Sequence, residues 1–141
     1  MRHFYDANRI TIKGDFCVYC GDVSTTVEHY PPVSVTNYGF KLPCCVECNN
    51  LAVDENPRDF EKRVHGIKSK IRRKNWKWLQ MPEWSHEELD NLSVKLRRDV
   101  IYALNRKSKT IKRLDFDALA YIAVIDTNSE FEQFFSNSEV A

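Results

Sequence analysis

The sequence has little that would anchor it in a membrane or send it out of the cell. Its longest uninterrupted apolar run, from Ala118 to Ile125, is eight residues long, whereas a membrane-spanning helix needs about 20. The first residues, from Met1 to Asp6, contain no apolar signal region. We therefore expect a cytoplasmic protein that makes no membrane contact.

The number of cysteines in the sequence is not even. The sequence contains five, an odd number that cannot all pair within one molecule. A chain without a secretion signal is expected to work where thiols stay reduced. Metal ligation is therefore a better explanation for these residues than disulfide bonds.

A large net charge is missing as well, because the formal charge is only +1. The charges are nevertheless unevenly distributed. From Lys62 to Lys77 there are eight basic residues and no acidic one. The rest of the chain contains the other 13 of the 21 basic residues and all 20 acidic residues. A strongly basic segment on an otherwise acidic body is typical of a phosphate-binding surface.

Two C-x-x-C pairs are the strongest motif in the chain. Cys17 and Cys20 form the first pair, and Cys45 and Cys48 form the second, with 24 residues between the pairs. Two such knuckles supply four thiolates to one Zn²⁺ and leave no coordination position open, so the site is expected to be structural. Cys44 is an alternative to Cys45, but its C-x-x-x-C spacing is less common, and we expect it to be a buried free thiol.

The expected fold is α+β, a small zinc-stapled ββα module followed by a helical C-terminal region. The β-prone stretch 25–30 is expected to end at Pro31, and a second short strand is expected from Tyr38 to Leu42. We place the zinc-bearing module with its basic helix at residues 1–80, and a helical extension of unknown function at 81–141.

Helical signals dominate after the second knuckle. A helical turn or two is expected at 49–53, and a longer helix from Asn56-Pro57, which reads as an N-cap with proline at the first helical position, to Pro82. Ser85 opens a capping box and a further helix. A third helix, capped by Asp115, is expected from Phe116 to Ile125, and a short one after Ser129. The apolar face of the basic helix would contain Phe60, Val64, Ile67, Ile71 and Trp78, and that of the next helix Leu89, Leu92, Leu96, Val100 and Leu104.

Chemistry-bearing residues lie between and after the knuckles. Val27-Glu28-His29-Tyr30-Pro31-Pro32 lies between them, and Asn49-Asn50 follows the second. This order resembles the HNH (ββα-metal) endonucleases, in particular the zinc-bearing branch typified by the recombination endonuclease VII family. The resemblance covers roughly residues 17–75. It implies a phosphodiester hydrolase acting on DNA, and a phage or mobile element as the setting.

The resemblance assigns roles to three residues. His29 would be the general base, while Glu28 and Asn49 would hold a catalytic Mg²⁺ or Mn²⁺. A neutral imidazole can take a proton from water, and a carboxylate is a hard oxygen ligand for such an ion. Adjacent residues on a regular strand point to opposite faces, so Glu28 and His29 need a bend to converge. The family usually has Asp at the position of Glu28, and no His follows Asn49 within the first helical turns.

The basic helix is expected to contact DNA phosphates. An ordinary solvated face is the alternative interpretation of its charges. The tryptophans nearby either stack on bases or pack the junction between two helices. The residues expected to bind nucleic acid are Arg63, Lys68, Lys70, Arg72, Arg73, Lys74 and Lys77.

Three hypotheses of function follow from the sequence. The first is a metal-dependent endonuclease acting on DNA, for which branched-DNA cutting would imply a homodimer. The second is a zinc module that binds nucleic acid or a protein without cleaving anything. The third is a protein–protein module whose working surface is the helical half. The Glu28, His29 and Asn49 set favours the first hypothesis.

Overall fold

The computed structural model describes residues 8–134, and within them the chain has the α+β fold that the sequence predicts. Its sheet has three strands, β1 (Arg9–Thr11), β2 (Thr26–Tyr30) and β3 (Gly39–Cys44). The strand order is β1-β3-β2, so β3 is central. β2 pairs with β3 antiparallel, and β1 pairs with β3 parallel.

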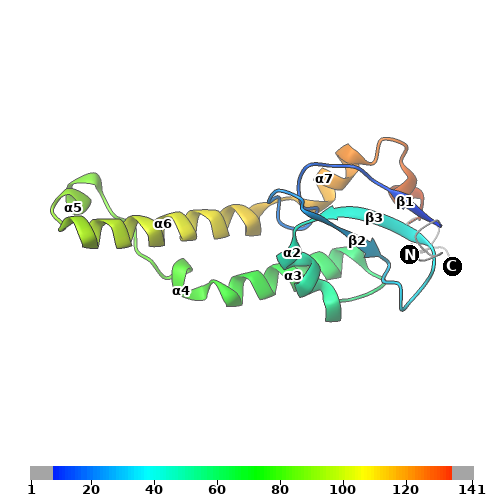
Figure 1. Ribbon diagram of the computed structural model, residues 1–141, viewed down its shortest axis with the longest axis horizontal. Coiled ribbons are helices and arrows are strands. Elements are labelled where there is room, and N and C mark those ends of the chain that lie inside the picture. Colours follow the sequence, from blue (N-terminus) through cyan, green and yellow to red (C-terminus); the bar gives the residue numbers. More distant parts are fainter. Residues whose placement is uncertain (1–7, 135–141) are drawn as a thin grey trace.

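Helices make up most of the chain after the sheet. They are α2 (Val46–Leu51), a 3₁₀ turn η1 (Ala52–Asp54), α3 (Phe60–Lys74), α4 (Trp76–Leu79), α5 (His86–Asp90), α6 (Val94–Asp115) and α7 (Ala118–Ile125). Figure 1 shows α2, α3 and α7 gathered around the sheet. The rest of the helical region projects away from it, with α5 at the far tip.

Alternation along the strands decides which face of the sheet is buried. Glu28 and Tyr30 of β2 are buried, whereas His29 between them is half-buried. Their partners across the ladder, Leu42 and Phe40, are buried on the same face. This face therefore points into the core.

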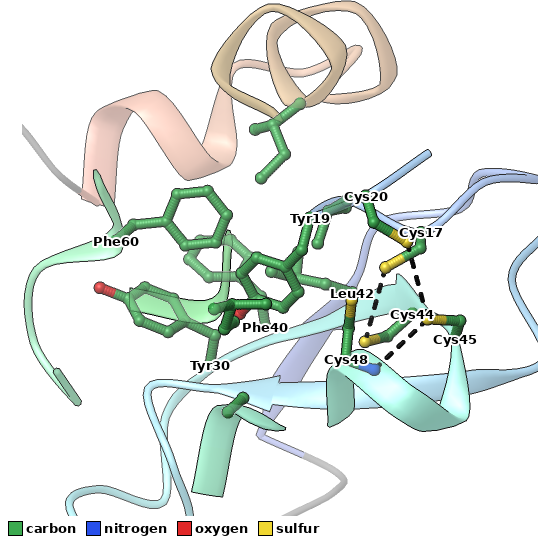
Figure 2. Close-up of a cluster of buried hydrophobic side chains, with 14 of the residues drawn as sticks. Cys17, Tyr19, Cys20, Tyr30, Phe40, Leu42, Cys44, Cys45, Cys48 and Phe60 are labelled. Atoms are coloured by element: carbon green, nitrogen blue, oxygen red, sulfur yellow. Dashed lines mark hydrogen bonds between the residues drawn. The ribbon is translucent and has the colours of Figure 1, made fainter. Parts of the chain in front are cut away.

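The core is built largely from aromatic rings. Tyr19 stacks on Phe60 with ring centroids 5.5 Å apart, and Tyr30 meets Phe60 edge-on at 5.2 Å. Phe131 closes the cluster 4.9 Å from Phe40. Figure 2 shows Tyr19, Tyr30, Phe40 and Phe60 packed beside the cysteine group, so one continuous core supports both.

Both predicted strands are present, and a third is added to them. β3 runs through Pro43 to Cys44 instead of ending at Leu42. This proline is tolerated because the ladder with β1 extends only as far as Lys41. No clear signal in the sequence predicts β1, a three-residue strand in a stretch of mixed composition.

Two helices, α3 and α7, begin later than the sequence predicts, whereas α2 begins at Val46, before the expected Asn49. The Oδ1 atom of Asn56 accepts hydrogen bonds from the backbone N–H groups of Arg58 and Asp59, so Asn56 forms a turn before the helix. Asp59 is the N-cap of α3, and its side chain accepts from the N–H of Lys62. Likewise Asp117, two residues after the predicted cap, caps α7. In both cases an aspartate nearer to the apolar run outcompetes the predicted cap.

Residues 76–109, which contain α4, α5 and most of α6, form a projecting arm (Figure 1). The capping box at Ser85 is present, but α5 ends at Asp90 and Ser93 caps a new helix, α6. The predicted buried stripe is buried only in part, because Leu96 is 54% exposed. The arm is two helices thick and offers that stripe no second layer to pack against.

The hydrophobic core does not stop at the end of the zinc-bearing module. Ile122 of α7 and Phe131 belong to the same buried cluster as Tyr19 and Phe40. Residues 130–134 are helical, as expected after Ser129. Segments from both ends of the chain therefore complete one core. Within residues 8–134, none of the helices is both long and apolar enough to cross a bilayer.

Candidate functional site

Four cysteines converge at one end of the sheet. Their sulfur atoms all lie within 4.8 Å of one another, and the group consists of Cys17, Cys20, Cys45 and Cys48. In a tetrahedral site with Zn–S bonds of about 2.3 Å, the sulfurs would be about 3.8 Å apart. The 3.7 Å between the sulfurs of Cys20 and Cys45 fits this geometry. The donor set and its spacing are therefore consistent with a structural Zn²⁺.

Local backbone geometry holds the two knuckles in place (Figure 2). The first lies in the loop before β2, where Gly21 has a φ of +79° and closes the turn. The second opens α2, and the sulfur of Cys45 accepts from the backbone N–H of Cys48 at 3.4 Å. The thiol of Cys44 is buried outside the four-cysteine group, 3.9 Å from the sulfur of Cys17.

Arg113 connects the end of α6 to the cysteine group. Its guanidinium lies 3.8 Å from the sulfur of Cys48 and 2.5 Å from the carboxylate of Glu47. The Nε atom lies 3.5 Å from the carboxylate of Asp22. A buried cation beside four thiolates offsets part of their negative charge.

The carboxylate of Glu28 lies in the core. The side chain is 3% exposed, and its Oε1 accepts a hydrogen bond from Nη2 of Arg63 at 2.8 Å. Arg63 also donates to the hydroxyl of Tyr19 and to the carbonyls of Glu55 and Asn56. This arginine therefore ties α3, the first knuckle and the loop before α3 to the middle of β2.

Burial governs the protonation of Glu28. Loss of hydration raises the pKa of this carboxyl to about 7, although the charge of Arg63 opposes the rise. Within residues 8–134, its second oxygen, Oε2, is buried and has no hydrogen-bond partner. Glu28 therefore acts as an internal ion-pair partner in this arrangement.

His29 and Asn49 lie outside the core. His29 is half-buried on β2, an edge strand, and Lys41 is its partner across the ladder on the same face. The side-chain amide of Asn49 donates to the carbonyl oxygen of Val27 at 3.1 Å and so fixes α2 against β2. Asn49 thus lies close to the strand that carries His29.

The residues predicted to hold a catalytic ion do not form a ligand set here. β2 runs straight through Glu28 and His29, so the bend that would let them converge is not there. The carboxylate of Glu28 faces Arg63 in the core, whereas the hydrogen bond from Nδ2 of Asn49 to Val27 does not involve its Oδ1 atom, the expected ligand. As they stand, these residues do not fit a divalent ion between them.

Part of the predicted basic surface is occupied by internal contacts. Arg63 is 3% exposed and ion-paired, contrary to its predicted place on a DNA-binding face. Lys68 donates to the carbonyl of Phe116, and burial lowers its pKa. Lys70 pairs with Asp54 and, at 2.7 Å, with Glu55. These three cations are therefore poorly placed to reach a phosphate. The remaining predicted residues, Arg72, Arg73, Lys74 and Lys77, are exposed.

Three cations on α6 adjoin the basic surface, although the sequence pattern did not single them out. Arg106, Lys109 and Arg113 line a pocket together with Lys74 of α3. Their spacing of three and four residues places them on one helix face, which is a signal that the sequence contains. Residues 100–114 also carry five basic and no acidic residues, but this run is less dense in charge than the segment 62–77, which has eight.

Comparison of the chain with protein-family models, with curated proteins and with solved structures finds no match. The assignment of function therefore depends on the residues and their geometry.

Proposed function

We propose that this protein is a zinc-stapled endonuclease of the HNH type, which hydrolyses phosphodiester bonds in DNA with His29 as general base. The observation that carries the proposal is the order of parts around the cysteine group. Strand β2 bears His29, β3 follows, and α2 opens on the second knuckle and is bonded back to β2 through Asn49. A strand–strand–helix unit of this kind is what the resembled family uses.

His29 has the exposure that such a role needs. It lies on an edge strand, half-buried, with the ammonium-bearing side chain of Lys41 as its cross-strand neighbour. In the reaction, a water oxygen attacks phosphorus, the neutral imidazole takes the proton of that water, and the bond to the 3′ oxygen breaks. The leaving oxygen then takes up a proton. The cation at Lys41 favours an anionic phosphate at this face.

A Mg²⁺ or Mn²⁺ ion held by Glu28 and Asn49 belongs to the same hypothesis. It would require the carboxylate of Glu28 to leave Arg63 and turn out of the core. Because the described arrangement does not fit such an ion, no step of this proposal depends on it.

A specific observation favours a second candidate, a zinc module that binds DNA without cleaving it. The acidic residue of the motif is buried and neutralised by a guanidinium, which removes the ligand that the family reaction needs. The two candidates share the zinc site and the basic surface and differ only in hydrolysis.

Nicking of supercoiled plasmid separates the two candidates. Zinc-loaded protein is incubated with plasmid in EDTA, in Mg²⁺ and in Mn²⁺, next to His29→Ala and the control His86→Ala, which alters an exposed histidine on α5. We expect His29→Ala to lower the rate about 10²–10⁴-fold and the control to leave it unchanged, with equal zinc content and DNA binding in all three proteins.

Two outcomes would contradict the nuclease proposal as stated. If the wild type binds DNA but never nicks it in any divalent ion, the binding module becomes the better conclusion. If cleavage survives His29→Ala, the protein is an enzyme with a different base.

A further inference from the structure

A pocket lies where α3, α6 and the second knuckle meet. Its volume is about 200 Å³. Cys45, Asn75 and Thr110 line part of it. The rest of the lining consists of two acidic and four basic side chains, which are Asp22, Glu47, Lys74, Arg106, Lys109 and Arg113. The function proposed above uses Cys45 for the zinc site and Lys74 for the basic surface, but it assigns no role to the pocket itself.

The two carboxylates are already neutralised by part of the cationic set. Glu47 lies 2.9 Å from the ammonium of Lys74 and 2.5 Å from the guanidinium of Arg113. Asp22 lies 3.5 Å from Arg113, and its distance of 4.0 Å from Lys109 is at the limit for an ion pair. Arg113 also faces the thiolates, so its charge offsets theirs. The pocket therefore retains positive charge on its open side.

Of the four cations that line the pocket, Arg106 is the one least engaged by neighbouring carboxylates. Within residues 8–134, no carboxylate lies within ion-pair distance of its guanidinium, which is instead 5.8 Å from the ring of Trp78. Lys74 and Lys109 are more than half exposed at their side chains. A planar guanidinium with two ammonium groups at the mouth of a pocket is a donor set suited to a phosphate oxyanion.

The pocket continues into an aromatic surface on the arm. Tyr102, Arg106, Lys109 and Arg113 follow one another at spacings of four, three and four, so they share a face of α6 about 16 Å long. Tyr102 is exposed and meets Trp78 edge-on at 5.7 Å, and the ammonium of Lys77 lies 4.4 Å from the Trp78 ring centroid. Cations beside exposed rings are the usual elements of a surface that binds a nucleic-acid strand.

We infer that this pocket is a phosphate subsite for one strand of nucleic acid, with Arg106 and Lys109 as its main ligands and Lys74 as the third. Tyr102 lies next along the same face, where a base of that strand can stack. The inference deepens the proposed function and rests on it, because it takes DNA as the polyanion. It moves the strand-binding surface from α3 alone to the seam between α3, α4 and α6.

The test compares two double variants with equal loss of charge. Arg106→Ala/Lys109→Ala alters the pocket, whereas Lys95→Ala/Arg98→Ala removes two exposed cations from the far end of the same helix. Binding of short single-stranded and duplex DNA to the zinc-loaded chain is measured by fluorescence anisotropy over a range of NaCl concentrations. Circular dichroism and zinc content confirm that each variant is folded.

We expect the pocket variant to lose about tenfold in affinity, and its duplex salt slope to flatten by roughly 0.9 for each phosphate that it no longer neutralises. The control pair should lose less than about threefold. Tyr102→Ala should weaken binding of the single strand more than that of the duplex, because only unpaired bases can stack on it.

Several outcomes would overturn the inference. Equal losses in the two double variants would mean that general charge, and not the pocket, attracts DNA. Inorganic phosphate that shifts the Arg106 Nε–Hε resonance, in a protein whose DNA binding does not depend on Arg106, would make this a small-anion site. A wild type that binds neither form of DNA would also overturn it.

The same measurements separate this inference from the nuclease proposal. If the wild type never nicks plasmid but the pocket variant loses DNA binding, the subsite stands and the hydrolysis fails. If the wild type nicks plasmid and the pocket variant binds and nicks equally well, the subsite fails and the nuclease stands.

Discussion

The body around the sheet and the projecting arm are stabilised in different ways. In the body, side chains as large as Tyr19, Phe60 and Leu42 are fully buried, and a four-cysteine group lies beside them. In the arm, α4 and α5 bury none of their residues completely. Its contacts are a line of side chains between α4 and α6, such as the Trp78–Tyr102 pair.

The difference shows that the two parts of this small domain depend on different sources of stability. A loop-rich segment cannot bury enough apolar surface to fold alone. We therefore expect the body to depend on a structural metal at its four-cysteine group, and on a core that segments from both halves of the chain complete. The arm has no such core and depends on the body to hold the ends of α3 and α6. Substitutions should therefore have large effects in the body and small effects in the arm.

The largest expected effect is the loss of the metal site. Cys48→Ser should unfold the body, since binding of a structural zinc contributes about 10–16 kcal/mol in comparable small modules. Cys44→Ala, which alters a buried thiol outside the four-cysteine group, should keep one zinc per chain and cost about 1 kcal/mol. Elemental analysis and thermal unfolding measure both effects. A folded, zinc-free wild type would contradict this prediction.

The next effect concerns the buried ion pair. Arg63→Met leaves the carboxylate of Glu28 without its partner in the core and should lower the free energy of unfolding by about 3–5 kcal/mol. Lys62→Met, at the exposed neighbouring position, should change it by less than about 0.5 kcal/mol. Urea titrations measure both values. If Arg63→Met costs no more than the control, the pair contributes nothing to stability.

A matched pair of leucines tests the comparison directly. Leu42 is fully buried on β3 and Leu96 is largely exposed on α6. Leu42→Ala should cost about 2–5 kcal/mol, and Leu96→Ala no more than about 0.5 kcal/mol. Equal losses would mean that the exposed arm stripe is covered in solution, which sedimentation velocity would then reveal as self-association.

The most gradual effect, and the smallest per step of the variable changed, is a dependence of stability on pH. Because the folded state raises the pKa of Glu28 to about 7, the folded protein binds this proton more tightly than the unfolded chain does. The contribution is complete below the ordinary carboxyl pKa of about 4.3, and it is lost as the pH rises toward 7. Stability should thus fall over this window by at most ~1.4 kcal/mol per pH unit.

Glu28→Gln removes the titration and serves as the reference. The difference in unfolding free energy between wild type and variant, measured in urea at several pH values, should change between about pH 4.3 and pH 7 and level off outside that window. A difference that does not vary with pH would show that Glu28 has the same pKa in both states.

Features set by neighbouring residues could be predicted from the sequence. The knuckle spacing predicted the grouping of the cysteines, and the recurrence of Phe60, Ile67 and Ile71 predicted the buried face of α3. The capping box at Ser85 was also correctly identified. The buried face and the capping box have causes that act within a turn or two of the chain. The cysteine pairs lie 24 residues apart, but their convergence could be predicted because one Zn²⁺ needs four ligands.

Features set by distant residues could not be predicted. The partner of Arg63 is 35 residues away, so a helix rich in cations could not reveal that one of them points into the core. The pairing of β1 with β3 joins segments about 30 residues apart, and the exposure of Leu96 depends on what the rest of the chain leaves uncovered. Strand alternation placed Glu28 and His29 on opposite faces, but the sequence alone could not show that the face of Glu28 is the one covered by Arg63.

The position of Phe131 has a consequence for synthesis on the ribosome. Its ring lies against those of Tyr30, Phe40 and Phe60, with centroids 6.0, 4.9 and 5.1 Å away. A nascent chain that has emerged only as far as Cys48 already carries all four cysteines of the metal group. The aromatic core, however, cannot be completed before Phe131 has emerged. Until that residue leaves the exit tunnel, the core rings are incompletely covered, and the growing chain is exposed to chaperones and proteases.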